Sequence, residues 1–231
     1  KLETMIGLTD IKARVKSWYR FLLFQQEREK AGFSSIHQPS LHLVFTGNPG
    51  TGKTTLARLM AEIYFELGLL SRPDVIEADR SSLVGAFVGQ TEEQVMNKVK
   101  EAEGGVLFID EAYALKRQDA SGSDYGQAAI DTLVAAMTSG EFAGKFVVIL
   151  AGYPEEMRHF LLANPGLRSR FPDSNHYELP NYSDEELVAI GEKVADDNNY
   201  VLTAEAKRAL LARLDRERVD ATFGNARTVH N

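Results

Sequence analysis

The sequence has no cysteine among its 231 residues. This excludes disulfide bonds and every metal site that is built on thiolates. It also has no apolar run of the roughly 18 residues that a membrane-spanning helix needs, and its N-terminus does not resemble a signal peptide. We therefore expect a cytoplasmic protein with no membrane span.

Basic residues are in the minority. The chain has 26 Lys and Arg against 33 Asp and Glu, which gives a net charge of −7 and a pI near 5.3. Proteins that bind phosphate backbones are usually basic, so nucleic acid is disfavoured as a partner, although a local basic groove is compatible with these numbers. The proportions of hydrophobic (44%) and charged (26%) residues are those of an ordinary globular protein.

Short apolar runs alternate with helical patterns through most of the chain. The pattern begins with an amphipathic helix over 10–30, in which apolar residues recur at helical spacing. The predicted strands are 41–46, 75–79, 105–110, 145–153 and 176–180, and the predicted helices between them are 53–67, 91–103, 125–138 and 154–162. Alternation of this kind predicts an α/β fold with a five-stranded parallel sheet covered by helices on both faces.

After Pro180 only helical patterns remain. Ser183 and Thr203 are the expected N-caps, because each is followed within three positions by an acidic residue. We therefore predict two domains, an α/β nucleotide-binding domain at 1–181 and a small all-helical domain at 182–231. The chain begins with Lys1 and stops inside a helical pattern, so we expect it to be a piece of a longer protein, with the second domain truncated at its C-terminus.

The segment GNPGTGKT at 47–54 fits the pattern G-x-x-x-x-G-K-[ST] and lies where that motif belongs, between a strand and a helix. Its glycines allow backbone N–H groups to turn toward an anion, and the start of the helix adds partial positive charge. Lys53 would reach the terminal phosphates, and the hydroxyl of Thr54 would bind Mg²⁺. This part of the chain predicts a nucleotide triphosphate site.

A second part of the site is predicted in GGVLFIDEAYAL at 104–115. Four apolar residues form a buried strand, and Asp110 and Glu111 follow at its carboxyl end, where open α/β sheets bind their ligands. Two adjacent carboxylates at this place favour a cation: Asp110 would help to hold Mg²⁺, and Glu111 would polarise the water that attacks the γ-phosphate. The pair predicts hydrolysis as well as binding.

Together these motifs resemble those of an AAA+ ATPase, in particular the CbbX/SpoVK-like branch, which includes red-type Rubisco activases, sporulation protein K and type VII secretion ATPases. The resemblance covers nearly the whole chain. It rests on the order and spacing of MIGLTDIK (5–12), GNPGTGKTT, LVGAFVGQT (83–91), GGVLFIDEAYAL, DYGQAAIDTL (124–133), VVILAGYPEEM (147–157), NPGLRSRF (164–171), PNYSDEEL (180–187) and FGNARTVHN (223–231). It implies a P-loop core with a helical lid, Mg²⁺-dependent ATP hydrolysis, and a hexameric ring that remodels a protein client through a central pore.

The resemblance also assigns individual residues. Arg170, with Arg168 as the second candidate, corresponds to the arginine finger offered to the neighbouring subunit, and Arg227 corresponds to sensor 2. The implied catalytic residues are Lys53, Glu111, Arg170 and Arg227. The implied nucleotide-binding residues are Ile6, Gly7, Pro49, Gly50, Thr51, Gly52, Lys53, Thr54, Thr55, Asp110 and Arg227, and Thr54 and Asp110 are the implied metal ligands. Where many AAA+ proteins carry a polar sensor 1 residue, this sequence has either Tyr153 or the preceding Gly152. The tyrosine either contacts a phosphate or water or packs as an ordinary tyrosine.

The segment GAFVGQT at 85–91 resembles the pore loop of protein-remodelling AAA+ members. Phe87, Val88 and Gly89 would form this loop and contact the client polypeptide. The competing interpretation is that Phe87 packs under a neighbouring helix.

Two other functions remain open at the level of sequence. One is a scaffold that assembles on binding ATP with little turnover, which the unusual residue at sensor 1 keeps open. The other is a DNA-directed AAA+ loader, which the acidic balance and the aromatic loop disfavour. The client is not identified by the sequence, since Rubisco, a sporulation component and a secretion component fit the motifs equally well.

Overall fold

The computed structural model describes residues 2–33, 39–87, 89–116, 125–218 and 223–230. Its centre is one sheet of five strands. The strands are β1 (Leu43–Thr46), β2 (Val75–Ala78), β3 (Val106–Ile109), β4 (Val147–Gly152) and β5 (His176–Glu178). Every pair of neighbours is parallel, in the order β2-β3-β4-β1-β5. The predicted five-stranded parallel sheet is confirmed, and each strand lies within its predicted range.

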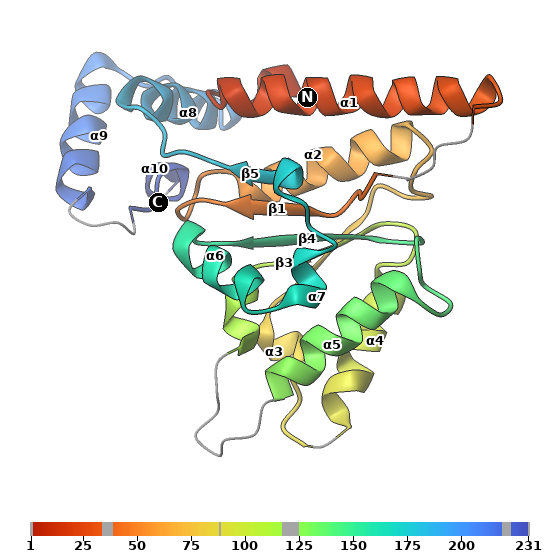
Figure 1. The fold of residues 1–231 in the computed structure, drawn as a ribbon. Coiled ribbons are helices and arrows are strands. Elements are labelled where there is room, and N and C mark those ends of the chain that lie inside the picture. The colour runs from red at the N-terminus through yellow and green to blue at the C-terminus, as the bar shows by residue number, and fades with distance from the viewer. Residues whose placement is uncertain (1, 34–38, 88, 117–124, 219–222, 231) are drawn as a thin grey trace.

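Helices cover the sheet and form the C-terminal part of the chain (Figure 1). They are α1 (Thr9–Lys30), α2 (Lys53–Glu66), α3 (Arg80–Leu83), α4 (Gln90–Glu101), α5 (Tyr125–Thr138), α6 (Pro154–Leu162), α7 (Pro165–Arg168), α8 (Asp184–Asp197), α9 (Ala204–Glu217) and α10 (Ala226–His230). Short 3₁₀ segments occupy Leu2–Thr4, Ala112–Lys116 and Asp173–Asn175. The predicted long helices are confirmed, whereas α3 and α7, each of four residues, are too short to show helical periodicity in the sequence.

The two faces of the sheet bury different side chains of the same strands. Phe45 and Phe108 belong to a core shared with α1 and α2, and Val44 and Leu107 belong to a core shared with α4, α5 and α6. This follows from the strand geometry, in which successive side chains point to opposite faces. Truncating a buried ring such as Phe108 to alanine would cost about 3 to 5 kcal/mol of stability.

Helix α1 is fixed to the core by a buried tyrosine of α2. The hydroxyl of Tyr64 accepts a hydrogen bond from Trp18 Nε1 at 3.0 Å and donates one to the carbonyl of Leu41 at 3.1 Å. Burial raises the pKa of this phenol well above its usual value. The two hydrogen bonds satisfy the polar end of a side chain that is otherwise surrounded by apolar groups.

The C-terminal helices form a small all-helical unit beside the sheet (Figure 1). Both predicted N-caps are confirmed: Ser183 forms a capping box with Glu186, and Thr203 Oγ1 accepts from the N–H of Ala206 at 3.2 Å. The predicted domain boundary after residue 181 lies in the connection between β5 and α8. Across the described parts of the chain, no helix has both the length and the apolar content needed to cross a bilayer.

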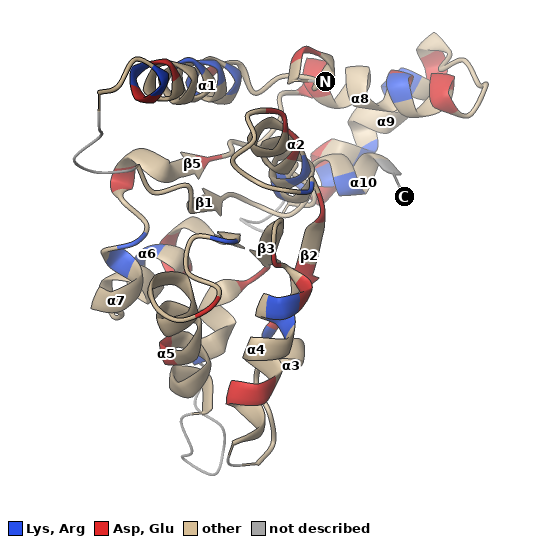
Figure 2. Ribbon diagram, turned by 90° about the vertical axis from the view of Figure 1, so that its right-hand side faces the viewer, with Lys and Arg blue, Asp and Glu red and all other residues tan. Residues whose placement is uncertain are grey.

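Charged residues of both signs are distributed over the helices, as Figure 2 shows for one side of the molecule. Helix α1 carries both, and its Lys16 forms an ion pair with Glu3. Surface pairs of this kind contribute about 0 to 1 kcal/mol each, so the fold depends on its two apolar cores far more than on these charges.

Candidate active site

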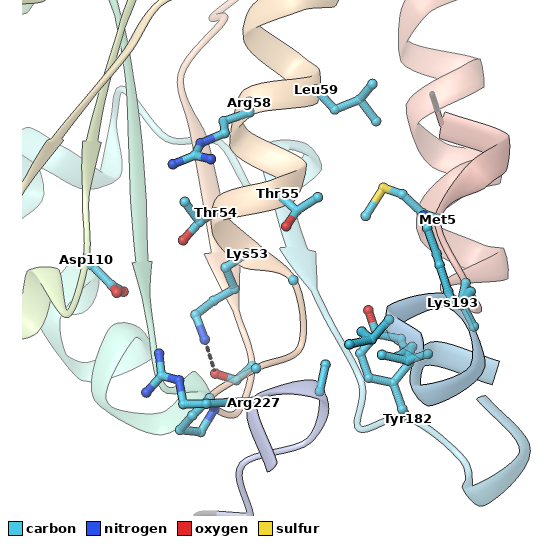
Figure 3. Close-up of a pocket in the computed structure, with 18 of the residues that line it drawn as sticks. Met5, Lys53, Thr54, Thr55, Arg58, Leu59, Asp110, Tyr182, Lys193 and Arg227 are labelled. Atoms are coloured by element: carbon cyan, nitrogen blue, oxygen red, sulfur yellow. Dashed lines mark hydrogen bonds between the residues drawn. The ribbon is translucent and has the colours of Figure 1, made fainter. Parts of the chain in front are cut away.

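A cavity of about 710 Å³ lies between the carboxyl ends of the strands, the start of α2, the N-terminal segment and the C-terminal helices. Its size is that of a site for a small ligand or cofactor. Figure 3 shows 18 of the residues that line it, with Lys53, Asp110 and Arg227 at one end and Met5, Leu59, Tyr182 and Lys193 at the other. The predicted site residues that line it are Ile6, Pro49, Gly50, Gly52, Lys53, Thr54, Thr55, Asp110, Glu111 and Arg227.

The loop after β1 has the backbone that a phosphate site needs. Gly50 and Gly52 adopt φ values of +71° and +96°, which side-chain-bearing residues rarely adopt, and Gly52 is the N-cap of α2. A Cβ at Gly50 would also collide with the carbonyl of Gly224. The loop can therefore turn its N–H groups toward the start of the helix, where the helix dipole favours an anion. Thr51 is fully buried, and its hydroxyl donates to Asn48 O at 2.8 Å, so its side chain is bonded within the loop and does not line the cavity.

The side chain of Lys53, the first residue of α2, turns back into this loop. Its ammonium donates to the carbonyls of Gly47 at 2.8 Å and Asn48 at 2.9 Å. Burial lowers the pKa of Lys53, the carboxylate of Asp110 opposes that shift, and Arg227 adds to it. A bound anion would favour the charged form of both cations, so the electrostatics of the cavity suit a polyphosphate.

The acidic half of the site lies at the end of β3. Asp110 is on the side toward which Lys53 and Thr54 point (Figure 3). Its Oδ1 accepts from the N–H of Glu111 at 3.0 Å, and Glu111 has a left-handed φ of 47°. Among the described residues no group of three or more His, Asp or Glu could hold a metal by itself. A Mg²⁺ ion, which takes few protein ligands and shares phosphate oxygens, fits the hydroxyl of Thr54 and the carboxylate of Asp110.

The two ends of the chain complete the cavity. Met5 and Ile6 line its apolar end together with Leu59 of α2, and Arg227 of α10 lies beside Lys53 (Figure 3). Gly7 instead contacts the C-terminal helices, since a Cβ there would collide with the carboxylate of Glu186.

Tyr182 and Asn225 also belong to this site, although no motif in the sequence predicts a role for them. Tyr182 lines the cavity, and its hydroxyl donates to Thr51 O at 3.2 Å. Asn225 is fully buried and bonds both to Tyr182 and to Pro49. The only signal in the sequence was their presence in the segments PNYSDEEL and FGNARTVHN, because contacts between residues more than forty positions apart leave no local pattern.

Tyr153, the predicted sensor 1 residue, lines the cavity, and its ring centroid lies 6.2 Å from that of Tyr113. The neighbouring Gly152 has no room for a side chain, because a Cβ would contact Tyr113 and Met157. The close packing of Gly152 against Tyr113 and Met157 therefore fixes the backbone that precedes Tyr153.

The remaining predicted residues lie away from the cavity. Phe87 is 73% exposed, which is not the exposure of a core side chain. Gly89, with φ +82°, is the N-cap of α4, and Val88 lies outside the described residues. Arg168 is exposed, whereas the guanidinium of Arg170 donates to Gly166 O at 2.7 Å.

Comparison with known protein families identifies the family to which this fold belongs. Residues 43–177 match the profile of the "ATPase family associated with various cellular activities (AAA)", and residues 183–231 match that of the AAA lid domain. The chain belongs to the AAA ATPase family. The helices after residue 182 are therefore the lid of this AAA ATPase, and its family activity is ATP hydrolysis.

Several curated proteins match this AAA ATPase over nearly its whole length. Protein CbbX of Cereibacter sphaeroides is 44% identical over 227 residues, covering 98% of this chain and 72% of CbbX. Stage V sporulation protein K of Bacillus subtilis is 40% identical over 234 residues, covering 100% of this chain and 70% of that protein. The chloroplastic ribulose bisphosphate carboxylase/oxygenase activase of Cyanidioschyzon merolae is 42% identical over 227 residues, covering 98% and 75%.

Solved structures with the same fold are more distant in sequence. A RuvB variant from Thermotoga maritima superimposes with a TM-score of 0.62 at 21% identity, covering 99% of this chain and 62% of RuvB. The AAA domain of FIGL-1, solved with ADP, gives 0.59 at 19% identity, covering 92% of this chain and 66% of that domain. At these identities the likeness concerns the fold alone.

Proposed function

We propose that this AAA ATPase binds and hydrolyses Mg²⁺-ATP in a ring, hexameric as the family resemblance implies, and uses the energy to remodel a protein client at a central pore. The observation that carries the proposal is the convergence of Lys53, Thr54, Asp110, Glu111 and Arg227 on one cavity. Lys53 and the loop amides would hold the phosphates, and Thr54 and Asp110 would hold the metal. Bound Mg²⁺ would neutralise charge on the phosphate oxygens.

Glu111 is the proposed general base for the attacking water. It lines the cavity one residue after Asp110, in a backbone conformation that costs on the order of 1 kcal/mol for a residue other than glycine. Strain of this kind persists where the surrounding structure holds it, and Glu111 lies just beyond the carboxyl end of β3. Tyr153, which also lines the cavity, is the proposed contact to phosphate or water in place of a polar sensor 1 residue.

The proposed client contact is Phe87. The base of its loop is fixed by α4: the N–H of Gly85 donates to Thr91 Oγ1 at 3.0 Å, and the N–H of Ala86 donates to Gln90 Oε1 at 2.9 Å. An exposed aromatic side chain on a fixed base suits contact with many polypeptide sequences. The name of the Cyanidioschyzon relative, an activase of another enzyme, supports a protein as the client.

Arg80 connects the segment that follows Glu111 to the helix that precedes the Phe87 loop. Its guanidinium donates to the carbonyls of Ala114 at 3.0 Å and Leu115 at 2.7 Å, in the segment that directly follows Glu111. Arg80 also begins α3, which ends just before the Phe87 loop. A shift at the end of β3 would therefore reach the loop through one side chain.

The test measures steady-state phosphate release with and without protein clients. Two probes are used: ribulose bisphosphate carboxylase/oxygenase, prompted by the relative's name, and casein, a protein without stable structure. We expect sustained turnover that at least one probe stimulates. Turnover that neither probe changes would exclude both as clients and leave ATP hydrolysis alone, and ATP-dependent assembly with no sustained release would favour the scaffold.

A further inference from the structure

Three consecutive carbonyl oxygens of the phosphate loop accept hydrogen bonds from the lid or from the connection that leads to it. The accepting residues are Pro49, Gly50 and Thr51. Their donors are, in that order, Asn225 Nδ2 at 3.3 Å, the N–H of Ala226 at 3.2 Å and the hydroxyl of Tyr182 at 3.2 Å. The lid and this connection therefore contact the phosphate loop through the backbone of the loop.

Asn225 links the lid, the connection that leads to it and the phosphate loop. Its Oδ1 accepts from the N–H of Tyr182 at 3.0 Å, and its Nδ2 donates to Asn181 Oδ1 at 2.9 Å as well as to Pro49 O. The residue is fully buried and has a φ of +48°, which asparagine adopts more readily than most residues. A buried amide whose donors and acceptor are all used is costly to disturb, because each lost partner leaves a polar group without water.

The carbonyl contacts fix the amides that face a phosphate. In a planar trans peptide the C=O of one residue and the N–H of the next point in opposite directions. The donors from the lid and its connection hold the carbonyls of residues 49, 50 and 51. The N–H groups of residues 50, 51 and 52 are therefore oriented away from these donors. Gly50 and Gly52 line the cavity there.

The same contacts place Arg227. It follows Ala226, whose N–H bonds to Gly50, and its own N–H bonds to Gly224 O at 2.9 Å. A Cβ at Gly50 would lie only 2.8 Å from the backbone nitrogen of Arg227, so the loop and the start of α10 are in direct contact. The position of the Arg227 side chain beside Lys53 (Figure 3) is thus tied to the conformation of the phosphate loop.

We infer that Asn225 and Tyr182 are positioning residues that couple the phosphate loop to the lid: they pre-orient the phosphate-binding amides, and through the same bonds a bound phosphate fixes the lid and Arg227. Coupling of this kind is reciprocal, so whatever strengthens the lid contact also strengthens phosphate binding. The inference rests on nucleotide binding by the loop and does not depend on a client or a pore. Lys53→Ala tests that nucleotide binding separately.

The first test is calorimetric titration with Mg-ADP. Tyr182→Phe removes one hydroxyl and keeps the ring, and Asn225→Gly removes the amide and keeps a backbone that tolerates positive φ. We expect Tyr182→Phe to bind about 5- to 10-fold more weakly, the effect of about one lost hydrogen bond, and Asn225→Gly, which loses several, to bind at least as weakly. Tyr200→Phe is the matched control, since Tyr200 lies in the lid and is 73% exposed, and it should bind as the parent does.

The second test measures the distance between the lid and the α/β domain, and it separates coupling from a general loss of stability. Because the chain has no cysteine, spin labels can be placed uniquely with Glu156→Cys on α6 and Ala209→Cys on α9, both at exposed positions. With Mg-ADP the parent should give one narrow distribution of label distances. Tyr182→Phe and Asn225→Gly should give broader distributions even when saturated with Mg-ADP.

Melting curves establish that the variants are folded. If folded Tyr182→Phe and Asn225→Gly bind Mg-ADP as Tyr200→Phe does, the inference is overturned. Weaker binding with an unchanged distance distribution would also overturn it, because the effect would then be local to the loop. Failure of Lys53→Ala to weaken binding would instead remove the nucleotide site itself, which is a different result.

Discussion

The ammonium of Lys53 lies 2.8 Å from the carbonyl oxygen of Gly47 and is held within its own loop (Figure 3). The lysine is partly buried, and burial lowers its pKa, so these carbonyls take the place of water around the charge. Phosphate oxygens are stronger partners for an ammonium than neutral carbonyls are. We therefore expect Lys53 to exchange the carbonyl of Gly47 for phosphate when a nucleotide binds.

Lys53→Ala should abolish measurable binding of Mg-ATP, because the cavity would lose the cation at its phosphate end. Isothermal titration of the variant is the measurement. Lys98→Ala is the control: Lys98 pairs with Glu101 on α4, and losing one ammonium there should leave the affinity unchanged. Unchanged affinity in Lys53→Ala would mean that the nucleotide does not bind at this loop.

Glu111→Gln should retain ATP binding and lose hydrolysis, because the amide keeps the shape of the carboxylate without its basicity. Loss of a general base lowers rates by about 10²- to 10⁴-fold. Phosphate release and ATP affinity are measured on the same preparation, with Glu155→Gln, an exposed residue of α6, as the control. Turnover within about twofold of the parent would assign the base role to another group.

Phe87→Ala should leave folding and nucleotide affinity intact and uncouple hydrolysis from work on a client. The reason is its exposure, which leaves little packing to lose. Stimulation of phosphate release by client protein is compared with that of Tyr200→Ala, which removes a ring of the same exposure, 73%, from the lid. A drop in stability of about 3 to 5 kcal/mol would instead identify Phe87 as a core residue.

Much of the fold could be predicted from the sequence because its signals are local. The helix of α5 was predicted at its observed bounds, 125–138, from periodicity, and the caps at Ser183 and Thr203 follow from neighbouring residues alone. The order of the strands was not predicted. Placing β1 between β4 and β5 depends on contacts between residues more than a hundred positions apart, for which no local pattern exists.

The same division holds for the site. Gly50, Lys53 and Asp110 were found from motifs, because phosphate and metal chemistry restrict which residue types can stand there. Asn225 and Tyr182 were not, since most of their partners are backbone groups, which do not depend on the identity of the partner's side chain. A contact to backbone leaves no requirement on the partner's side chain, and so no motif.

Acid should destabilise the fold through His42. Its Nδ1 accepts from the N–H of Val148 at 2.9 Å, and burial, assisted by Arg170, lowers its pKa from 6.5 to about 4. The unfolded chain therefore binds this proton more readily than the folded one. Stability is unaffected by His42 above pH 6.5 and falls as the pH drops from 6.5 toward 4, by no more than about 3 kcal/mol in total.

The measurement is the free energy of unfolding by urea at several pH values between 4 and 7. Carboxylates also titrate in this range, so the control is His42→Asn, whose amide oxygen can accept from Val148 and carries no titrating proton. The difference between the two pH profiles is the contribution of His42. Parallel profiles would show that His42 is protonated equally in the folded and unfolded chains.

ATP hydrolysis should depend on assembly, because the family resemblance assigns Arg170 to the nucleotide of a neighbouring subunit. Within the chain its Nη groups donate to Gly166 O, to Ser169 Oγ and to Thr138 Oγ1 at 3.3 Å. Its Nε is buried without a partner among the described residues. Arginine fingers contribute about 10³- to 10⁵-fold to phosphoryl transfer, so specific activity should rise with protein concentration as rings form.

The decisive experiment mixes two inactive variants. Arg170→Ala subunits keep an intact phosphate loop, and Lys53→Ala subunits keep an intact Arg170. At a mixed interface the intact loop of one subunit meets the intact arginine of the other. Hydrolysis by the mixture should exceed that of either variant alone, with crosslinking to establish that they co-assemble and melting curves to establish that both fold. Arg168→Ala is the matched control, two residues away and exposed, and should remain active. Full activity of Arg170→Ala alone, or co-assembly without recovered hydrolysis, would contradict the assignment and make Arg168 the next candidate.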